Sequence, residues 1–270
     1  MTATIAQAAR SVLMTAEPAQ KVRTARDMTR KWRRGMLSHE FDVAMPDIPS
    51  RPDTPELLPP GRMPRRGKGG SMRGRIALIH ALAHIELVAI DLAFDLMGRF
   101  GAQFPRRFID DWIAVGADEA MHFALLDRRL RQFGSHYGAM PAHDGLWDSA
   151  RDTARDALAR LAIVPMVLEA RGLDVTPATI ERFEAAGDVG TARVLRRILS
   201  DEISHVAAGT RWFESACKQG GFVPETHWRM LVNRHFHGGL KPPFNDSARA
   251  TAGLTRDYYQ ALVSNASLPH

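Results

Sequence analysis

Two short stretches of the chain carry the same acidic and imidazole pattern. Residues 117–123 read ADEAMHF and residues 200–206 read SDEISHV, so both contain Asp-Glu-x-x-His. On a helix, residues three apart lie on one face, so the Glu and the His of each copy reach the same point. Carboxylate and imidazole groups together are typical ligands of transition-metal ions. One Glu-x-x-His arises easily by chance, and the second copy makes the pattern informative.

Both copies lie on apolar helical stripes, where a charged side chain needs a compensating partner. Burying an unpaired carboxylate costs several kcal/mol. Apolar residues at helical spacing surround Glu119 and Glu202: Trp112, Val115, Phe123 and Leu126 around the first, and Leu195, Ile198, Leu199 and Val206 around the second.

Two further predicted helices each carry one ionisable residue on their apolar stripe, Glu86 in the first and Glu169 in the other. The spacing repeats, because the interval from Glu86 to Glu119 equals the interval from Glu169 to Glu202. Two helical hairpins of equal reach would bring four carboxylates to a similar depth, and cations must then neutralise them. We therefore predict a site for two metal ions, with these ligands: Glu86, Glu119, His122, Glu169, Glu202 and His205.

Other readings of these residues remain open. A buried Glu also pairs with arginine, and Arg171 and Arg196 are near in sequence. His80 and His84 have the spacing of a helical zinc pair, but Glu86 lies roughly 120° and 160° from them around the helix. They are predicted to be hydrogen-bonded interface residues. Pro165 should bend its helix before Glu169, either for packing or to open room beside the metals.

Helical periodicity dominates the chain, and no alternating strand pattern is visible. Two short helices are predicted at 4–15 and 18–35, and seven prolines between Pro46 and Pro64 predict an extended strap. The glycine-rich stretch 65–75 lacks the spacing of a phosphate loop and is predicted to be a flexible entry to the next helix. Helices are then expected at 73–100, 105–134, 150–172, 177–186, 188–218, 224–236 and from Ser247 to Val263.

These elements predict an all-α fold, a four-helix bundle with helical extensions at both ends. Three segments are expected: 1–72 with the first helices and the strap, 73–218 as the metal-binding bundle, and 219–270 as a C-terminal helical extension.

Composition limits the function classes further. Hydrophobic residues make up 45% of the 270 residues, which suits a soluble protein with a sizeable core. The single cysteine, Cys217, excludes a disulfide framework within the chain. No secretory signal or membrane span is visible, so we expect a cytoplasmic protein. Residues 1–75 carry fifteen Lys or Arg against seven Asp or Glu. Such a basic segment is typical of a solvated surface, and it could also attract nucleic acid.

The six predicted ligands resemble those of the ferritin-like di-iron carboxylate proteins, in which two helices give one Glu each and two give Glu-x-x-His. The resemblance covers about residues 73–218, and a matching residue is present at every ligand position. It implies that Asp118 and Asp201 orient the histidines of the opposite helices. More closely, HALAHIELVAIDLAFDL, the proline strap and LKPPFND resemble an uncharacterised bacterial ferritin-like family that is distantly related to the tRNA isopentenyladenosine hydroxylase.

Carboxylate-rich ligation without cysteine favours two iron ions, or manganese or a mixed Fe/Mn pair, over zinc or copper. The resemblance implies an oxygen-activating oxidase or hydroxylase, with dioxygen, an unidentified small molecule and an electron donor protein as partners. RNA is a less favoured partner, and a monomer or small homo-oligomer is expected. Alternatives are a tRNA-modifying hydroxylase, a ferritin-like iron oxidiser and a metal-stabilised scaffold. A tyrosyl-radical enzyme is disfavoured, because the three tyrosines lie outside the ligand-bearing segments: Tyr137, Tyr258 and Tyr259.

Overall fold

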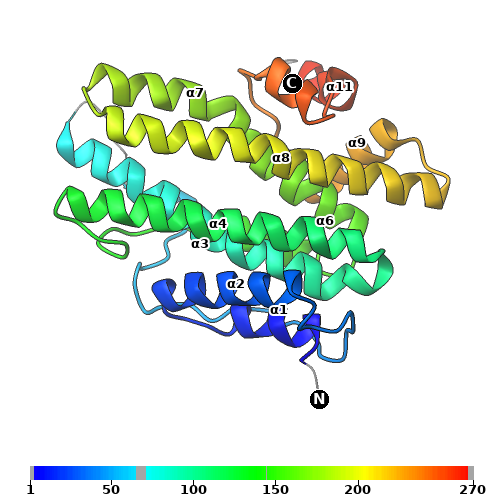
Figure 1. Cartoon of the computed structure of the whole chain (residues 1–270). Coiled ribbons are helices and arrows are strands. Elements are labelled where there is room, and N and C mark those ends of the chain that lie inside the picture. The colour runs from blue at the N-terminus through cyan, green and yellow to red at the C-terminus, as the bar shows by residue number, and fades with distance from the viewer. Residues whose placement is uncertain (1–2, 65–70, 144, 267–270) are drawn as a thin grey trace. The chain divides into compact units, whose positions relative to one another are not determined.

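The computed structural model describes residues 3–64, 71–143 and 145–266, and the described chain is helical (Figure 1). Within these ranges β-structure is limited to two isolated bridges. The predicted all-α helical bundle fold is therefore confirmed. The chain forms two compact units, Met1–Trp147 and Asp148–His270. The predicted segments 1–72, 73–218 and 219–270 follow sequence features instead of these units, and that division stays a prediction.

The first unit is built around a helical hairpin of α3 and α4, which pack along each other (Figure 1). Two shorter helices form an outer layer, with α1 against α3 and α2 against α4. Short 3-10 turns, η1 and η2, precede α3 and α4. The bounds are α1 Ile5–Leu13, α2 Pro18–Arg33, η1 Pro60–Arg62, α3 Met72–Phe100, η2 Gly101–Gln103 and α4 Arg106–Gln132. The four predicted helices of this unit are confirmed, with ends shifted by a few residues.

Local sequence explains where these helices begin. Thr4 and Gln7 form a capping box at the start of α1. Pro18 occupies the first turn of α2, and Ser71 caps α3 by accepting a hydrogen bond from Gly74 N at 3.1 Å. A Cβ on Gly116 of α4 would lie 2.6 Å from the ring of Phe94 of α3, so the glycine leaves room for that ring between the two helices.

The proline-rich segment is extended over the helices of the first unit. The strap, residues 46–64, is free of α-helix as predicted, but it contains the 3-10 turn η1 at Pro60–Arg62, which was not predicted. Ser50 N donates to Leu13 O at 2.8 Å, and Leu58 N donates to Ala142 O at 2.7 Å. Arg99 donates to Pro46 O at 2.8 Å. These backbone contacts fix a segment that forms no α-helix of its own.

The second unit contains a helical hairpin in which α7 and η3 pack against α8. Helix α9 packs against α6, and α11 packs against α9. The boundary between the units falls within α5, Gly145–Asp152. The bounds of the other elements are α6 Ala157–Ile163, η3 Val164–Glu169, α7 Ala170–Ala185, α8 Val189–Gly220, α9 Pro224–His235, α10 Asp246–Thr251 and α11 Arg256–Ala266. Asp188 caps α8 by accepting from Thr191 N at 3.0 Å.

Three predictions for this unit were wrong. The helix predicted at 150–172 is interrupted between α5, which ends at Asp152, and α6, which begins at Ala157, and it includes a π-helix, η3, at Val164–Glu169. It does not end at Gly172, and the separate helix predicted at 177–186 is instead the last part of α7, which runs to Ala185 with Pro177 inside it. Packing against α8 outweighs the low helix propensity of glycine and proline. Pro165 lies in this π-helical turn, and the bend expected there stays a prediction. The last predicted helix is divided into α10 and α11 by Gly253, whose φ is +79°.

One segment of the described chain, Met72–Gln103, is long and apolar enough to cross a membrane by length and composition alone. Of its most apolar window, 72% is buried inside the protein, as in the core helix of a soluble protein. The predicted cytoplasmic localisation stays a prediction. The predicted flexible entry to α3 lies largely outside the described residues, because residues 65–70 are among those not described.

Candidate metal centre

Three predicted ligands come together in the first unit, from α3 and α4. Glu86, Glu119 and His122 are 5%, 1% and 0% exposed. The Nδ1 atom of His122 lies 3.3 Å from Oε2 of Glu86 and 3.4 Å from Oε2 of Glu119. Each of the three residues offers one ligand atom, and these atoms lie within 4.8 Å of one another. This buried cluster could hold a metal ion.

The helix geometry explains the convergence. Glu119 and His122 are one turn apart on the inner face of α4, as their spacing predicted. Gly116 lies one turn before Glu119, and its missing Cβ brings α4 close to Ala93 and Phe94 of α3. Ala93 is two turns beyond Glu86 on the same face of α3. The tight contact between the two helices therefore sets the distance between the two carboxylates.

The electrostatics of the cluster are those of acids buried together. Burial raises the pKa of Glu86 well above its usual value, and the charge of Glu119 raises it further. Burial alone would lower the pKa of His122, but its hydrogen bonds and charge interactions with Glu119 and Glu86 raise it to about 11. Without a metal the imidazole is therefore a cation between two carboxyl groups. A metal ion bound there would take over the role of that positive charge.

The second unit holds the other three predicted ligands. Glu202 and His205 are 8% and 1% exposed on α8, with Nδ1 of His205 3.7 Å from Oε1 of Glu202. Glu169 is half-buried at the end of η3, which packs against α8. Each unit thus supplies one Glu from one helix and a Glu-x-x-His pair from the neighbouring helix.

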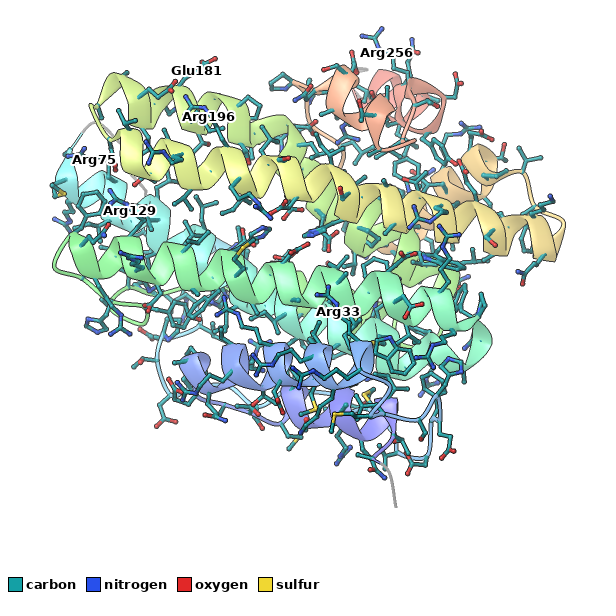
Figure 2. All side chains as sticks on the ribbon, viewed as in Figure 1. Arg33, Arg75, Arg129, Glu181, Arg196 and Arg256 are labelled. Atoms are coloured by element: carbon teal, nitrogen blue, oxygen red, sulfur yellow. The ribbon has the colours of Figure 1, made fainter. Side chains whose placement is uncertain are left out.

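The arginines near this second group bind elsewhere. Arg171 donates to Lys241 O at 2.7 Å and lies 3.6 Å from Asp174. Arg196 forms an ion pair with Glu184 of α7, on the outer part of the second unit (Figure 2). The reading in which these arginines neutralise the predicted ligands therefore loses support.

Asp118 and Asp201 precede the two Glu-x-x-His pairs and are both partly buried. Asp201 accepts a hydrogen bond from Nε of Arg197 at 2.6 Å, within its own helix. That the two Asp residues orient His205 and His122 stays a prediction.

His80 and His84 lie outside the cluster, as predicted from their angular positions. Nε2 of His84 lies 3.0 Å from His143 O, and Nδ1 lies 2.9 Å from the Tyr137 hydroxyl. His80 accepts a hydrogen bond from Gly138 N at 2.9 Å and stacks on the Tyr137 ring. Burial lowers the pKa of His84 to about 4, so the ring is neutral, donates to the carbonyl and accepts from Tyr137. Both histidines therefore hold the loop that follows α4.

At least two buried ion pairs were missed by the sequence reasoning: one joins Arg249 and Asp174 in the second unit, and the other lies in the first unit. Lys21 of α2 and Asp91 of α3 are 1% and 4% exposed and form a direct ion pair. Lys21 also donates to Ser50 O of the strap at 3.4 Å. A signal was present, because Lys21 shares an apolar helical stripe with Ala25, Thr29 and Trp32. A buried Lys in such a stripe requires an acidic partner.

The chain has recognisable relatives along nearly its whole length. A family model described as "Protein of unknown function (DUF455)" matches residues 14–260. A protein of Haemophilus influenzae described as "Uncharacterized protein" is 35% identical over 261 residues, which cover 93% of this chain and 90% of that protein. No solved structure matches the chain. On these two matches, the chain belongs to the DUF455 family of proteins of unknown function.

Proposed function

We propose that this protein is an oxygen-activating oxidase or hydroxylase with a dinuclear iron centre, acting on a small molecule. One observation carries the proposal: Glu86, Glu119 and His122 converge in the buried interior of the first unit. Two carboxylates and one imidazole are an oxygen-rich donor set that suits iron or manganese. Manganese or a mixed pair would use the same ligands.

Two metal ions are proposed because the second unit repeats the donor set. Glu169, Glu202 and His205 come from a helical hairpin of the same design, and the sequence interval between the two Glu residues is the same in both hairpins. In the ferritin-like arrangement that the sequence resembles, two such halves share one pair of metals. The ferritin-like bundle, with all six residues as ligands, is part of this proposal.

The chain's own residues would prepare the site for that chemistry. Bound iron would supply the activation of dioxygen. Glu86 and Glu119 would provide negative charge at a place from which water is excluded, and His122 would give up its proton before its nitrogen can bind a metal. Metal binding is therefore linked to proton release and should strengthen as the pH rises. The apolar residues around Glu119, among them Trp112 and Phe123, keep the site dry.

The alternatives differ in what they require. A tRNA-modifying hydroxylase would need RNA contacts, for which the basic segment 1–75 is the candidate. A ferritin-like iron oxidiser would consume dioxygen with ferrous iron and need no organic substrate. Oxygen uptake that rises with added substrate favours the hydroxylase over the iron oxidiser.

The test begins with the metal. Purified protein from iron-replete cells should contain close to two iron or manganese ions per chain by elemental analysis, and Glu119→Ala with Glu202→Ala should remove most of them. The matched control is Glu56→Ala with Glu181→Ala, which replaces two exposed Glu, the second labelled in Figure 2. This control should retain its metal.

Activity is tested on reconstituted protein. Anaerobic loading with ferrous iron, followed by oxygen and candidate substrates including tRNA, should give a product that is heavier by one oxygen atom or lighter by two hydrogen atoms. Protein that holds no metal after expression and after reconstitution would sink the proposal. Metal binding with oxygen uptake but no organic product would leave the iron oxidiser as the function.

A further inference from the structure

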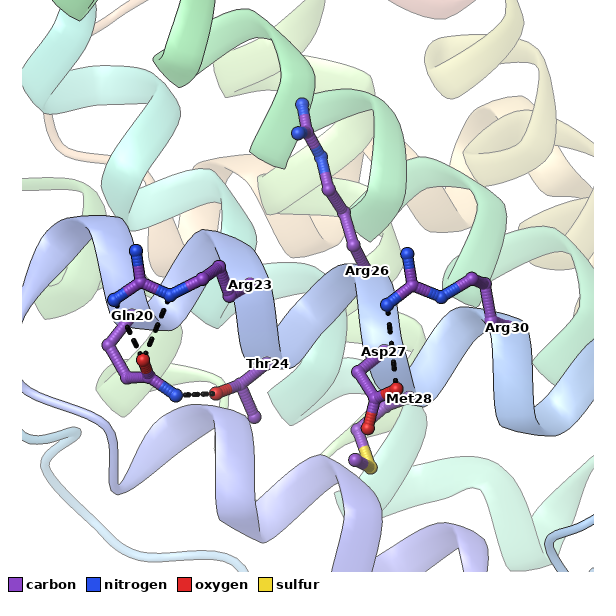
Figure 3. A pocket seen from close by; sticks show the side chains of 7 residues that line it. All are labelled: Gln20, Arg23, Thr24, Arg26, Asp27, Met28 and Arg30. Carbon is purple, nitrogen blue, oxygen red and sulfur yellow. Dashed lines mark hydrogen bonds and ion pairs between the residues drawn. The ribbon is translucent and has the colours of Figure 1, made fainter.

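Helix α2 presents a row of four exposed arginines to solvent. The arginine row consists of Arg23, Arg26, Arg30 and Arg33, spaced by three, four and three residues along one helix. This spacing places them on one face, and they span about 15 Å along the axis. The side chains of Arg23 and Arg30 are 65% and 62% exposed. Arg23, Arg26 and Arg30 also line a shallow hollow on the helix surface (Figure 3).

The positive charge of the row is only partly compensated. Arg23 lies 3.8 Å from Glu17, and Arg30 lies 3.5 Å from Asp27, which also pairs with Lys31 at 2.8 Å. Among the described residues, the guanidinium groups of Arg26 and Arg33 take part in no hydrogen bond or ion pair. The row therefore attracts an anionic partner.

The row lies over the helix that carries two of the predicted ligands. Trp32 Nε1 donates to Asp110 at 2.7 Å, and Thr29 Oγ1 donates to Ile113 O at 3.4 Å, so α2 runs antiparallel to α4. Continuing this pairing brings the first turns of α2, near Arg23, alongside the Glu119–His122 turn of α4. Packed helices have axes about 8–10 Å apart. The surface of α2 is thus one helix layer from the candidate metal centre.

From this placement we infer that the arginine row is the docking surface of an acidic electron-transfer protein that reduces the metal centre. This inference rests on the proposed function, in which the centre must be reduced before it meets dioxygen. Two one-electron donors, each with a reduced [2Fe–2S] cluster, would be oxidised in turn, and two ferric ions would become two ferrous ions. No bond of the chain forms or breaks in this step.

The surface fits a folded acidic protein better than other anions. Electron-transfer complexes are small and depend on charge, and they need no large apolar anchor. A single-stranded nucleic acid gains affinity by stacking bases on aromatic side chains, but Trp32 is 2% exposed, under Arg106. A membrane surface would need an exposed apolar face, yet Val22, Ala25 and Trp32 point into the protein.

The experiment measures binding first, so that it does not depend on activity. The probe is an acidic plant-type [2Fe–2S] ferredoxin, titrated against the full-length chain with and without iron, at about 20 and 200 mM salt. The row variant carries Arg→Gln at all four row positions. The matched control carries Arg→Gln at four exposed positions of the second unit and so loses the same charge: Arg151, Arg155, Arg193 and Arg234.

The unaltered chain should bind the ferredoxin at low salt and lose affinity at high salt, whether iron is present or not. The row variant should bind roughly 10–100-fold more weakly, because it loses electrostatic attraction, and the control should stay within about threefold. A variant with Arg→Lys at the same positions should keep most of the affinity, which shows that the charge is what matters. Reduction of the ferric protein by the ferredoxin should slow in the row variant, while reduction by dithionite should not.

The inference would be overturned if the unaltered chain did not bind the ferredoxin at low salt. It would also be overturned if the row variant and the control lost the same amount of affinity. An RNA duplex that binds more tightly than ferredoxin, and is lost in the row variant, would assign the row to nucleic acid instead. Anionic vesicles that bind in the same way would assign it to a membrane surface. If the protein binds iron and takes up oxygen after it has been reduced by dithionite and freed from it, but ferredoxin does not reduce it, only this inference fails. If the protein binds no metal, the proposed function is wrong. The titration of the metal-free chain still shows whether the ferredoxin docks on the arginine row.

Discussion

Replacing Lys21 by Met should expose how strongly the outer helices depend on one buried ion pair. Lys21 of α2 and Asp91 of α3 are almost fully buried, and each is the other's charged partner. Removing the ammonium group leaves a carboxylate in a dry place. Breaking such a pair from one side costs about 3–5 kcal/mol of unfolding free energy. The loss should also free the strap at Ser50, which Lys21 holds through a hydrogen bond.

The loss of unfolding free energy in Lys21→Met should depend on pH, because Asp91 is a titrating carboxyl group. Burial raises the pKa of Asp91 to about 6, although Lys21 and Arg51 act in the opposite direction. A carboxyl group with a raised folded-state pKa stabilises the protein most below its unfolded pKa, and this stability is lost as the pH rises through the folded pKa. The difference between the usual pKa of an Asp and the value of about 6 for Asp91 corresponds to roughly 3 kcal/mol of unfolding free energy. Without Lys21 the pKa rises further, so Lys21→Met should lose most stability above pH 7 and little near pH 4.

Urea unfolding at pH 5 and pH 7.5, followed by circular dichroism, measures both quantities. The double variant Lys21→Met with Asp91→Leu removes both charges and should recover most of the lost stability, because paired burial of charge is close to neutral. A loss of less than about 1 kcal/mol in Lys21→Met at pH 7.5, or a loss that does not shrink toward low pH, would refute this account of the pair.

Two further predictions concern the second unit and the support of the histidines. Asp118→Ala and Asp201→Ala should each weaken metal affinity by about 10–100-fold with unchanged helix content, measured by competition with a metallochromic chelator; unchanged affinity in both would mean that these Asp residues do not orient the ligands. Gly209→Ala should lower the unfolding free energy by about 1–3 kcal/mol, because its Cβ would lie 2.4 Å from the ring of Pro165. Gly172→Ala, with nothing within 4 Å, is the control and should be neutral or stabilising, so equal losses in the two variants would contradict the packing argument.

The sequence predicted most of the helices because their apolar residues recur at helical spacing, and the structure shows local signals at several helix starts. Ser71, Pro18 and Asp188 act at helix starts, as caps or as a first-turn proline, and each signal is read from a few neighbouring residues. The continuation of α7 through Gly172 could not be predicted in this way, because it depends on packing against α8. The break at Gly253 was missed because a helical pattern surrounds it.

The candidate site shows the same division between local and distant information. Helical spacing predicted that Glu119 and His122 share a face, and the equal intervals between the paired Glu residues predicted that Glu86 belongs with them. The ion pair of Lys21 with Asp91 joins residues 70 apart, and the Tyr137 contact with His84 joins residues 53 apart. No periodicity links such partners, and only the packed structure brings them together.

The π-helix in the second unit determines where Glu169 lies. Pro165 packs against Gly209 of α8, and without a Cβ on that glycine the two backbones come close. Glu169 is one turn beyond Pro165, while His205 is one turn before Gly209 in a helix that runs the opposite way. The same contact that admits the proline thus brings Glu169 alongside the Glu202–His205 pair. Gly116 plays the corresponding part for Glu86 in the first unit. In each hairpin a glycine thus accommodates a ring from the neighbouring helix close to the predicted ligands, Phe94 beside Gly116 and Pro165 beside Gly209.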